Sequence, residues 1–408
     1  MIGVIADDVT GATDVAAALS RAGLRTLLSL TTELEPGEAE ADAIVIGLKT
    51  RSIPVADAVA QSLAALAALR AAGAECAYFK YCSTFDSTPE GNIGPVTEAL
   101  AAELGAALVV TTPAAPLHGR TVTGGRLFVG GVPLDETHMR EHPVTPMRDS
   151  SVPRLLAPQV AGEVGLLPLE VVRAGAAAVR DAVASAEASG VVQLVADATE
   201  DADLDVIAEA IDGAPLVAGS AGLVGALARR RPASGRAASA PPAGRTAIIA
   251  GSCSRRTLEQ IDRFQRSGAP SYRLRAERGD TAEGLAAGAL AWWDAHSGDG
   301  SALIYSSSPA AERDAEFPEA GELYERTAGL LAEGLAARGV QRLLVAGGET
   351  SGEVVRALRM GTAVVGEEAA LGAPWIHDPR RALHLVLKSG NFGEPGLFVD
   401  VAGAGAAS

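Results

Sequence analysis

The chain has 408 residues, of which 48% are hydrophobic and 4% aromatic, and its formal net charge is −16. This length predicts two domains with separate cores, and a composition rich in alanine, glycine, valine and leucine favours helices and buried parallel strands. Acidic charge spread along the chain argues against nucleic acid and anionic membranes as partners, and no apolar run is long enough to span a bilayer.

Short apolar runs alternate with amphipathic, alanine-rich segments in the first half of the chain, which predicts βαβ units around a parallel sheet. The N-terminal MIGVIADDVTG is expected to be the first strand, since it lacks the basic start of a signal peptide. Strands are predicted at 2–6, 24–30, 43–48, 76–80, 107–112, 191–196 and 216–218, and helices at 10–22, 55–71, 94–103, 169–189 and 203–212. Residues 113–158, rich in proline and glycine, are predicted to be a long loop of the kind that often has a function.

Residues 229–245 lack apolar periodicity and have the composition of a flexible linker. The predicted domains therefore span residues 1–228 and 246–400, and the tail after them is expected to fray. In the second domain, strands are predicted at 246–250, 302–305, 342–345 and 383–387, and helices at 255–267, at 281–296 and in a long segment up to residue 338. The fold class is α/β, with two domains that each contain a mainly parallel sheet flanked by helices.

Polar side chains follow several strands of the first domain, at the sheet edge where α/β proteins bind ligands. Asp7 and Asp8 follow the first strand. Helix capping explains one such carboxylate, whereas an adjacent pair is also suited to a general base or a magnesium contact. Lys49 and Arg51 follow the 43–48 strand, where they either bind an anion or form a solvated charged loop.

The segment KYCSTFDSTPEGN, residues 80–92, is the most informative stretch of the chain because it places an ammonium, a carboxylate and several hydroxyl or amide groups after one apolar run. Lysine is scarce in this chain, with three lysines against 31 arginines. Because lysine is a compact charge suited to phosphate or carboxylate, Lys80 is expected to contact an anionic ligand. The loop that contains His118 and Arg120 is expected to close the pocket.

In the second domain, the strands that end near residues 250 and 345 run into GSCSRRT, at 251–257, and AGGETSGEVV, at 346–355. Glycine and hydroxyl turns that open helices hold phosphates through backbone amides, so these turns, with LKSGNFG at 387–393, predict a nucleotide site. A Walker motif and a GxGxxG fingerprint are both missing, which argues against P-loop and ordinary dinucleotide enzymes.

Metal and disulfide motifs are weak. Cys76, Cys82 and Cys253 have no CxxC spacing, which argues against a disulfide framework or a thiolate zinc site and predicts a reducing, cytoplasmic location. HMREH, at 138–142, matches an inverted zinc motif but lies among prolines, where a zinc-bearing helix is disfavoured. We therefore assign no metal ligands from the sequence.

Taken in order, ADDVTGATD, KTRS, KYCSTFDSTPEGNIGPV, HGRTV, GSCS, GGETSG and LKSGNFG resemble the four-carbon acid sugar kinases, from residue 3 to about residue 399. The resemblance implies an N-terminal domain that binds a sugar acid, a C-terminal domain that binds ATP with Mg²⁺, and an active site in the cleft between them. The implied substrate-side residues are Asp7, Asp8, Arg51, Lys80, Asp86, Ser87, Thr88 and Asn92. We add Arg120, from the loop expected to close the pocket, to the predicted substrate-binding residues. The implied ATP-side residues are Ser252, Ser254, Gly347, Gly348, Glu349, Thr350 and Gly390.

Threonate and erythronate kinases of that family carry a shorter central motif, close to KxDSTLRGN, whereas this chain has a longer one with Glu90 in place of the arginine. In this respect the chain is similar to the 3-oxo-tetronate kinases. The resemblance implies phosphorylation of the 4-hydroxyl of 3-oxo-tetronate, with Asp8 preferred to Asp86 as proton acceptor and with Lys80 and Arg51 on the substrate carboxylate.

Three alternatives stay open at this point: a D-threonate or D-erythronate kinase, a non-catalytic sensor of sugar acid and nucleotide, and a nicotinamide-dependent oxidoreductase, which the missing fingerprint disfavours. The expected partners are a small sugar acid and ATP, and the sequence leaves open whether the chain forms a homo-oligomer.

Overall fold

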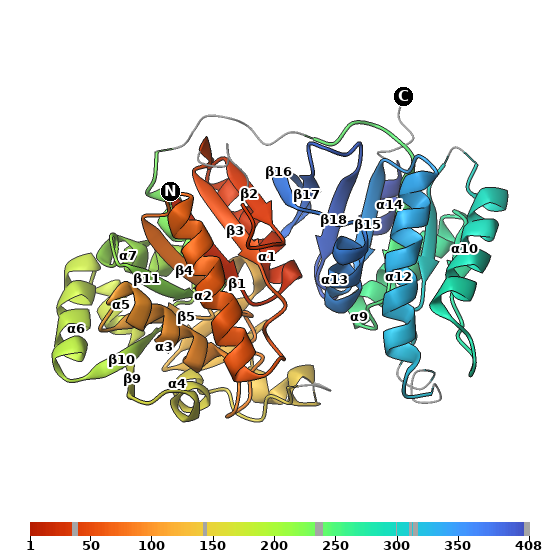
Figure 1. The fold of residues 1–408 in the computed structure, drawn as a ribbon. Helices are drawn as coiled ribbons and strands as arrows, with labels where there is room; N and C mark the ends of the chain where they lie inside the picture. Colours follow the sequence, from red (N-terminus) through yellow and green to blue (C-terminus); the bar gives the residue numbers. More distant parts are fainter. Residues whose placement is uncertain are drawn as a thin grey trace. The chain divides into compact units, whose positions relative to one another are not determined.

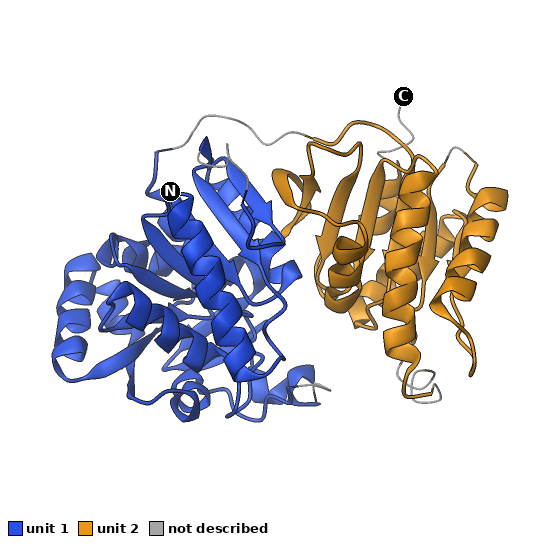
Figure 2. Ribbon diagram, in the orientation of Figure 1, with its two compact units in different colours: residues 1–236 blue, residues 237–408 orange. Residues whose placement is uncertain are grey.

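The computed structural model describes residues 1–34, 40–141, 145–232, 240–298, 300–309, 312 and 317–403. The chain divides into two compact units, residues 1–236 (unit 1) and 237–408 (unit 2), as Figure 2 shows. The division falls within the expected linker. Residues 233–239 of that linker, and the tail from residue 404, lie outside the described residues. The positions of the units relative to one another are not determined, so each is described by itself, and the expected cleft between them stays a prediction.

Unit 1 contains an eight-stranded sheet in the order β2-β3-β1-β4-β11-β5-β10-β9, in which neighbouring strands are parallel (Figure 1). The five residues of β1 are all buried, since helices cover both faces of a parallel sheet and its strands need no polar alternation. Helices α1 and α8 pack together, as do α2 and α3. The strands are β1 (Ile2–Ala6), β2 (Thr26–Ser29), β3 (Ala43–Gly47), β4 (Cys76–Lys80), β5 (Val109–Thr112), β9 (Glu163–Leu167), β10 (Val191–Ala196) and β11 (Leu216–Gly219). The helices are α1 (Val9–Arg21), α2 (Val55–Ala71), α3 (Ile93–Leu104), α4 (Val152–Leu156), α5 (Leu169–Arg173), α6 (Ala176–Ala188), α7 (Asp201–Ala210) and α8 (Ala221–Arg229).

The segment predicted as a long loop, residues 113–158, is partly regular. It contains a three-stranded antiparallel sheet of β6 (Arg120–Thr123), β7 (Arg126–Val129) and β8 (Val132–Pro133), besides α4. Two glycine pairs, at 124–125 and 130–131, form the turns with φ between 58° and 82°. Two-residue hairpin turns favour such left-handed glycine conformations, so the expectation of an irregular loop was wrong and a hairpin signal was overlooked.

The single helix predicted over residues 169–189 is in fact two helices, α5 and α6. Gly175 separates them with a φ of 104°, a conformation that a helix does not contain. The strand β9, just before them, was not predicted, although residues 164–167 form an apolar run, because a run so short, followed at once by Pro168, does not distinguish a strand from the start of a helix.

Unit 2 has the strand order β13-β14-β12-β15-β18-β17-β16, in which β17 is antiparallel to both of its neighbours and the remaining pairs are parallel. Its core packs Ile248, Leu344 and Trp375 of the sheet against Phe264 of α9 and Phe398 of α14. The strands are β12 (Thr246–Ala250), β13 (Ser271–Arg273), β14 (Ala302–Tyr305), β15 (Arg342–Ala346), β16 (Thr362–Ala370), β17 (Ala373–His377) and β18 (His384–Lys388). The helices are α9 (Arg255–Arg266), α10 (Ala282–His296), α12 (Ala320–Ala337), α13 (Gly348–Ala357) and α14 (Leu397–Gly403).

The predicted fold class, α/β with mainly parallel sheets in two domains, is therefore confirmed. Within the described ranges, no helix combines the length and apolar character that a membrane span requires.

Candidate active site

The first cluster of predicted site residues lies where β1, β3 and β4, which are neighbours in the sheet, end. Backbone hydrogen bonds join the three strand ends. The N–H of Asp7 donates to the carbonyl of Lys80 at 3.0 Å, and the carbonyl of Asp7 accepts from the N–H groups of Thr50, at 2.9 Å, and Arg51, at 3.2 Å. The parallel sheet thus brings the three polar motifs together, as the rule for ligand sites in α/β folds predicts.

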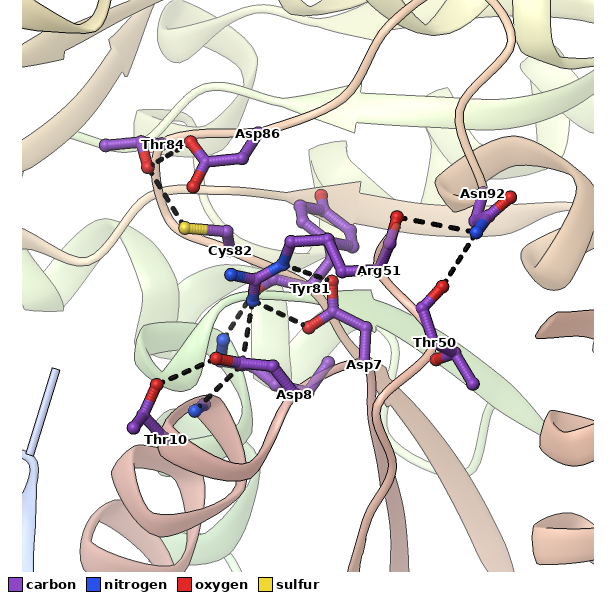
Figure 3. A network of polar contacts seen from close by, with 12 residues as sticks. Asp7, Asp8, Thr10, Thr50, Arg51, Tyr81, Cys82, Thr84, Asp86 and Asn92 are labelled. Carbon is purple, nitrogen blue, oxygen red and sulfur yellow. Dashed lines mark hydrogen bonds and ion pairs between the residues drawn. The ribbon is translucent and has the colours of Figure 1, made fainter. Parts of the chain in front are cut away.

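Arg51 lies between the two aspartates at this edge, as Figure 3 shows. Its Nε and Nη2 atoms donate to the two carboxylate oxygens of Asp7 at 3.0 and 2.9 Å, and Nη2 also donates to Oδ1 of Asp8 at 2.7 Å. A bidentate pair of this kind fixes orientation as well as charge. Both oxygens of Asp7 are therefore engaged by Arg51, so Asp7 orients the guanidinium, and its expected contact with substrate stays a prediction.

Of the roles that the sequence left open for Asp8, the structure shows helix capping, and the role of general base or magnesium contact stays a prediction. It caps α1, since its Oδ1 accepts from the N–H of Gly11 at 2.9 Å and its Oδ2 accepts from the hydroxyl of Thr10 at 2.7 Å. Burial acts to raise its pKa, but Arg51, Lys80 and these hydrogen bonds outweigh burial and lower the pKa below the ordinary value. Asp8 is therefore an ionised carboxylate at neutral pH.

Asp7 and Asp8 differ in accessibility and in pKa. Burial raises the pKa of Asp7 above its usual value, against the opposing effect of Arg51. The side chain of Asp7 is 6% exposed and that of Asp8 is 19% exposed. Asp8 is thus the better placed of the two to meet a ligand.

Lys80 completes this charged cluster. Its side chain is buried, and its Nζ donates to the carbonyl of Tyr81 at 2.6 Å. A Cβ atom built on Gly11 would lie 2.3 Å from Oδ1 of Asp8 and 3.1 Å from Nζ of Lys80. Residue 11 therefore has to be a glycine for the carboxylate and the ammonium to approach the start of α1 as they do.

The segment after β4 is held by an aromatic pair. Phe85 is fully buried with a φ of 52°, and its ring meets the ring of Tyr81 edge-on at 5.4 Å. Left-handed backbone is rare for a bulky residue and occurs where the surrounding structure imposes it, often at functional sites. The turn presents Asp86, whose Oδ1 accepts from the hydroxyl of Thr84 at 2.6 Å (Figure 3).

Ser87 and Thr88 lie in a tight turn that Gly91 closes. The N–H of Gly91 donates to the carbonyl of Thr88 at 2.8 Å, and a Cβ on Gly91 would lie 1.9 Å from Oγ of Ser87. Cys82, at the start of the segment, is no candidate nucleophile, because burial raises the pKa of its thiol to about 11.

Asn92 has a structural role that the sequence did not predict. Its Nδ2 donates to the carbonyls of Thr50 at 2.7 Å and Ile53 at 2.9 Å, with Arg51 O at 3.4 Å. Its amide group thus holds the loop that carries Arg51 (Figure 3). Asn92 is therefore a loop anchor, and its expected contact with substrate stays a prediction.

The loop predicted to close the pocket is attached to α1. Nε2 of His118 lies 3.0 Å from Oδ1 of Asp14, and Nη1 of Arg120 donates to the carbonyl of His118. The Arg120 guanidinium is therefore used in part to shape its own loop. Its contact with substrate, and the closing movement, stay predictions.

Unit 2 contains a cavity of about 480 Å³ between the ends of its parallel strands and α12. Small-molecule sites typically measure about 300–1,000 Å³. The residues that line it are Gly251, Ser252, Cys253, Ser306, Ser308, Phe317, Pro318, Ala320, Gly321, Tyr324, Glu325, Gly347, Gly348, Glu349 and Thr350. Hydroxyl groups and glycines thus face aromatic and apolar side chains, a combination suited to a nucleoside phosphate.

Glycines allow two of the predicted turns to pack closely at this cavity. The N–H groups of Gly251 and Ser252 both donate to the carbonyl of Ala346 at 3.0 Å. A Cβ on Gly251 would lie 2.2 Å from Oγ1 of Thr350. Gly347, with a φ of 131°, precedes α13 without any side-chain cap, which leaves the first amides of that helix available to an anion. The residues present therefore fit the phosphates of a nucleotide.

Ser254 and Gly390 are structural partners. Ser254 caps α9 by accepting from the N–H of Thr257 at 3.2 Å, and its hydroxyl donates to the carbonyl of Gly390 at 2.6 Å. A Cβ on Gly390 would lie 2.2 Å from Oγ of Ser252. Of the two serines, Ser252 lines the cavity and Ser254 fixes the turn, and the expected contact of each with ATP stays a prediction.

Sequence reasoning missed the part played by Lys388. Its side chain is fully buried, and its Nζ contacts Thr257, Ser389 and Gly390. The scarcity of lysine and the place of Lys388 in the LKSGNFG motif were the available signals, but no role was assigned to its side chain.

No group of three histidine, cysteine, aspartate or glutamate side chains suited to a metal ion occurs in the described part of the chain. His138 lies in a short 3-10 helix, and His142 lies outside the described residues.

Comparisons with known proteins agree with this division of the site. A family model described as a sugar-binding N-terminal domain matches residues 2–227, and one described as a nucleotide-binding C-terminal domain matches residues 247–398. A sugar-binding and a nucleotide-binding domain in one chain are the combination that a sugar kinase requires.

Two curated relatives are named 3-oxo-tetronate kinase. The protein from Brucella melitensis is 41% identical over 98% of this chain and 94% of its own length, and that from Cupriavidus necator is 43% identical over 98% and 95%. The chain belongs to the four-carbon acid sugar kinase family. It is an enzyme, a phosphotransferase with an alcohol group as acceptor.

Solved structures share the fold. A protein from Salmonella typhimurium LT2, described there as a tRNA synthase, has a TM-score of 0.88 and 39% identity, with 98% of both chains covered. A protein from Haemophilus influenzae has a TM-score of 0.79 and 38% identity, with 99% of this chain and 100% of the other covered.

Proposed function

We propose that this enzyme transfers the terminal phosphate of ATP, bound with Mg²⁺, to the 4-hydroxyl of 3-oxo-tetronate and forms 3-oxo-tetronate 4-phosphate. The observation that carries the proposal is the cluster at the end of β1, where an ionised and partly accessible carboxylate, Asp8, lies beside Arg51 and Lys80. The choice of substrate rests on the names of relatives that are 41–43% identical over nearly the whole chain.

Asp8 is the proposed general base. An ionised carboxylate can accept the hydroxyl proton as the oxygen attacks phosphorus, and the lowered pKa of Asp8 keeps it ionised at neutral pH. Asp86 is the less favoured alternative, since its Oδ1 accepts from Thr84 within its own turn. Proton transfer to a positioned side chain typically contributes about 10²–10⁴-fold in rate.

Lys80 and Arg51 are the proposed partners of the substrate carboxylate. A four-carbon acid is short, so the groups that bind its two ends have to be neighbours. The cluster meets this requirement, because the charges of both Arg51 and Lys80 act on Asp8. The bidentate pair of Arg51 with Asp7 would keep the guanidinium oriented before substrate arrives. Ser87 and Thr88 supply hydroxyl groups on the turn that follows, and they are proposed to meet the hydroxyl and keto oxygens.

On the nucleotide side, the amides of Gly348, Glu349 and Thr350 open α13 and are proposed to bind phosphate oxygens, with Ser252 beside them. When bound, Mg²⁺–ATP supplies the phosphoryl group and offsets the charge of its own phosphates. Phe317 and Tyr324 give the cavity an apolar wall suited to the nucleoside.

A coupled assay of ADP release with Mg²⁺–ATP tests the proposal on 3-oxo-tetronate, D-threonate and D-erythronate. Turnover with the keto acid in strong preference to the other two is the expected result. Turnover with threonate or erythronate alone would keep the family and refute the proposed substrate. Tight binding of both ligands without ADP release would instead support a sensor.

A further inference from the structure

We infer that Lys388 is the positioning residue of the nucleotide site: its buried ammonium holds the turns around the cavity together and supplies the positive charge that favours phosphate there. This inference rests on the proposed use of ATP by unit 2. The sequence placed the LKSGNFG segment at the nucleotide site, but of its residues only Gly390 was assigned to ATP.

Lys388 joins all three glycine and hydroxyl turns of unit 2. Its Nζ donates to Oγ1 of Thr257 at 3.1 Å, in the GSCSRRT turn, and to the carbonyls of Ser389 and Gly390 at 3.0 Å. Its own backbone carbonyl accepts from the N–H of Gly347 at 3.0 Å, in the GGET turn. Gly347 lines the cavity, so the lysine lies one residue removed from the surface that would bind nucleotide.

The carbonyl of Gly390 is the centre of this network. It accepts from Nζ of Lys388 at 3.0 Å, from Oγ of Ser254 at 2.6 Å and from Oγ1 of Thr257 at 2.9 Å. A carbonyl oxygen has two lone pairs, so three donors converge on it only where the geometry is tightly imposed. Removal of the ammonium would loosen the contact between the start of α9 and the turn after β18.

The charge of Lys388 is unusual for its location. The side chain is fully buried, and within the described residues no carboxylate forms an ion pair with it. Burial, with the nearby charge of Arg256 added, lowers the pKa of its amine to about 7, so near neutral pH only part of the molecules carry the charge without a ligand. All three of its partners are acceptors, which matches the three donors of an ammonium. Buried charges are normally paired or bind ligands, since an unpaired one is costly. An anionic ligand at the adjacent cavity would offset that cost.

The second cation that is buried in unit 2, Arg342, offers a matched control. Arg342 begins β15 and lies 4% exposed over the ring of Trp375 at 4.7 Å. In the register of the sheet, Arg342 pairs with His384 and Ala346 pairs with Lys388, so the two cations lie at opposite ends of the same pair of strands. Arg342 is therefore far from the turns, and its loss reports only the cost of removing a buried cation from this sheet.

The test is calorimetric titration of the full chain with Mg²⁺–ATP and with AMP, for the wild type, Lys388→Met and Arg342→Met. Lys388→Met is expected to weaken ATP binding about 10- to 100-fold, as loss of hydrogen bonds to a charged group implies, and to weaken AMP binding less. Arg342→Met is expected to leave both affinities within about threefold of the wild type while it lowers the melting temperature. Binding of 3-oxo-tetronate is expected to be unchanged in both variants.

Equal losses for ATP and AMP, or an unchanged ATP affinity in Lys388→Met, would overturn the inference. Failure of the wild type to bind ATP would refute the proposed function and the inference with it. This outcome differs from failure of the inference alone, in which the wild type binds ATP and only the variants depart from the expected affinities. Should Lys388→Met fail to fold, Thr257→Val tests the inference instead, since it keeps Lys388 and removes one hydrogen-bond partner of its Nζ. It is expected to weaken ATP binding about 3- to 10-fold, and wild-type affinity would contradict the network.

Discussion

Replacement of Asn92 by aspartate is the substitution whose effect the structure defines most closely. Aspartate matches asparagine in size, but it cannot donate the hydrogen bonds that Nδ2 of Asn92 gives to the carbonyls of Thr50 at 2.7 Å and Ile53 at 2.9 Å. Asn92 is 7% exposed, so the new carboxylate would face carbonyl oxygens with little access to water. The loop that carries Arg51 would lose its anchor.

Each buried carbonyl left without its donor costs about 1–3 kcal/mol. Thr50 is almost fully buried and Ile53 is partly exposed, so Asn92→Ala is expected to lower the free energy of unfolding of unit 1 by about 2–4 kcal/mol. Asn92→Asp is expected to cost more, about 3–5 kcal/mol, because it adds a buried charge next to acceptors. Either loss is a large part of the roughly 5–15 kcal/mol that stabilises a typical domain. The order of the two variants, with Asn92→Asp less stable than Asn92→Ala, is a stricter test than the size of either loss.

Urea unfolding followed by two probes measures this effect. Trp292, Trp293 and Trp375 all belong to unit 2, so tryptophan fluorescence follows that unit, whereas far-ultraviolet circular dichroism follows both. The dichroism transition of unit 1 is expected to move to lower urea while the fluorescence transition stays. Asn391→Asp, at the exposed second asparagine of the chain, is the matched control and is expected to change stability by less than about 0.5 kcal/mol. An Asn92→Asp variant as stable as Asn92→Ala, or as the control, would refute the anchoring role.

Three further predictions concern the two ligand sites. Asp8→Asn is expected to lower kcat about 10²- to 10⁴-fold, and more than Asp86→Asn does, in the ADP-release assay; the reverse order would assign the base to Asp86. The positive charge of Lys80 helps to lower the pKa of Asp8, so Lys80→Met is expected to move the acid limb of the kcat/KM profile to higher pH, and an unmoved limb would contradict Asp8 as base. Gly251→Ala would place a Cβ 2.2 Å from Oγ1 of Thr350 and is expected to weaken ATP binding at least about 10-fold by calorimetry. Gly288→Ala, on α10 and outside the cavity lining, serves as control, since its Cβ would meet only Oη of Tyr272 at 3.8 Å, and equal effects would argue against close packing of the turns.

Buried strands and long helices were predictable from the sequence. The strands β1 and β4 and the helix α2 have the predicted ends, because each is an apolar or amphipathic run bounded by polar or turn residues. The helix predicted over 169–189 and the loop predicted over 113–158 were wrong for one physical reason, which is that glycines able to adopt a positive φ were not used as signals. Gly175 ends a helix, and the pair at 124–125 makes a hairpin turn.

The convergence of Asp7, Asp8 and Arg51 was also predictable, since parallel strands place their carboxyl ends at one edge of the sheet. The sequence did not predict which of these charged side chains would form ion pairs with one another. The same holds for Asn92 and Lys388, whose side chains meet groups 42 and 131 positions away in the chain. Such contacts depend on side-chain direction across the finished sheet, and no local pattern in the sequence encodes them.

The position of the new phosphate ester tests the central claim most directly. The enzyme is incubated with Mg²⁺–ATP and 3-oxo-tetronate, and the product is examined by proton-coupled phosphorus NMR. Transfer to the terminal hydroxyl predicts a phosphomonoester resonance split into a triplet by the two protons on carbon 4, with one ADP formed for each ester. A doublet from a secondary carbon, or ADP formed without any new ester, would contradict the account.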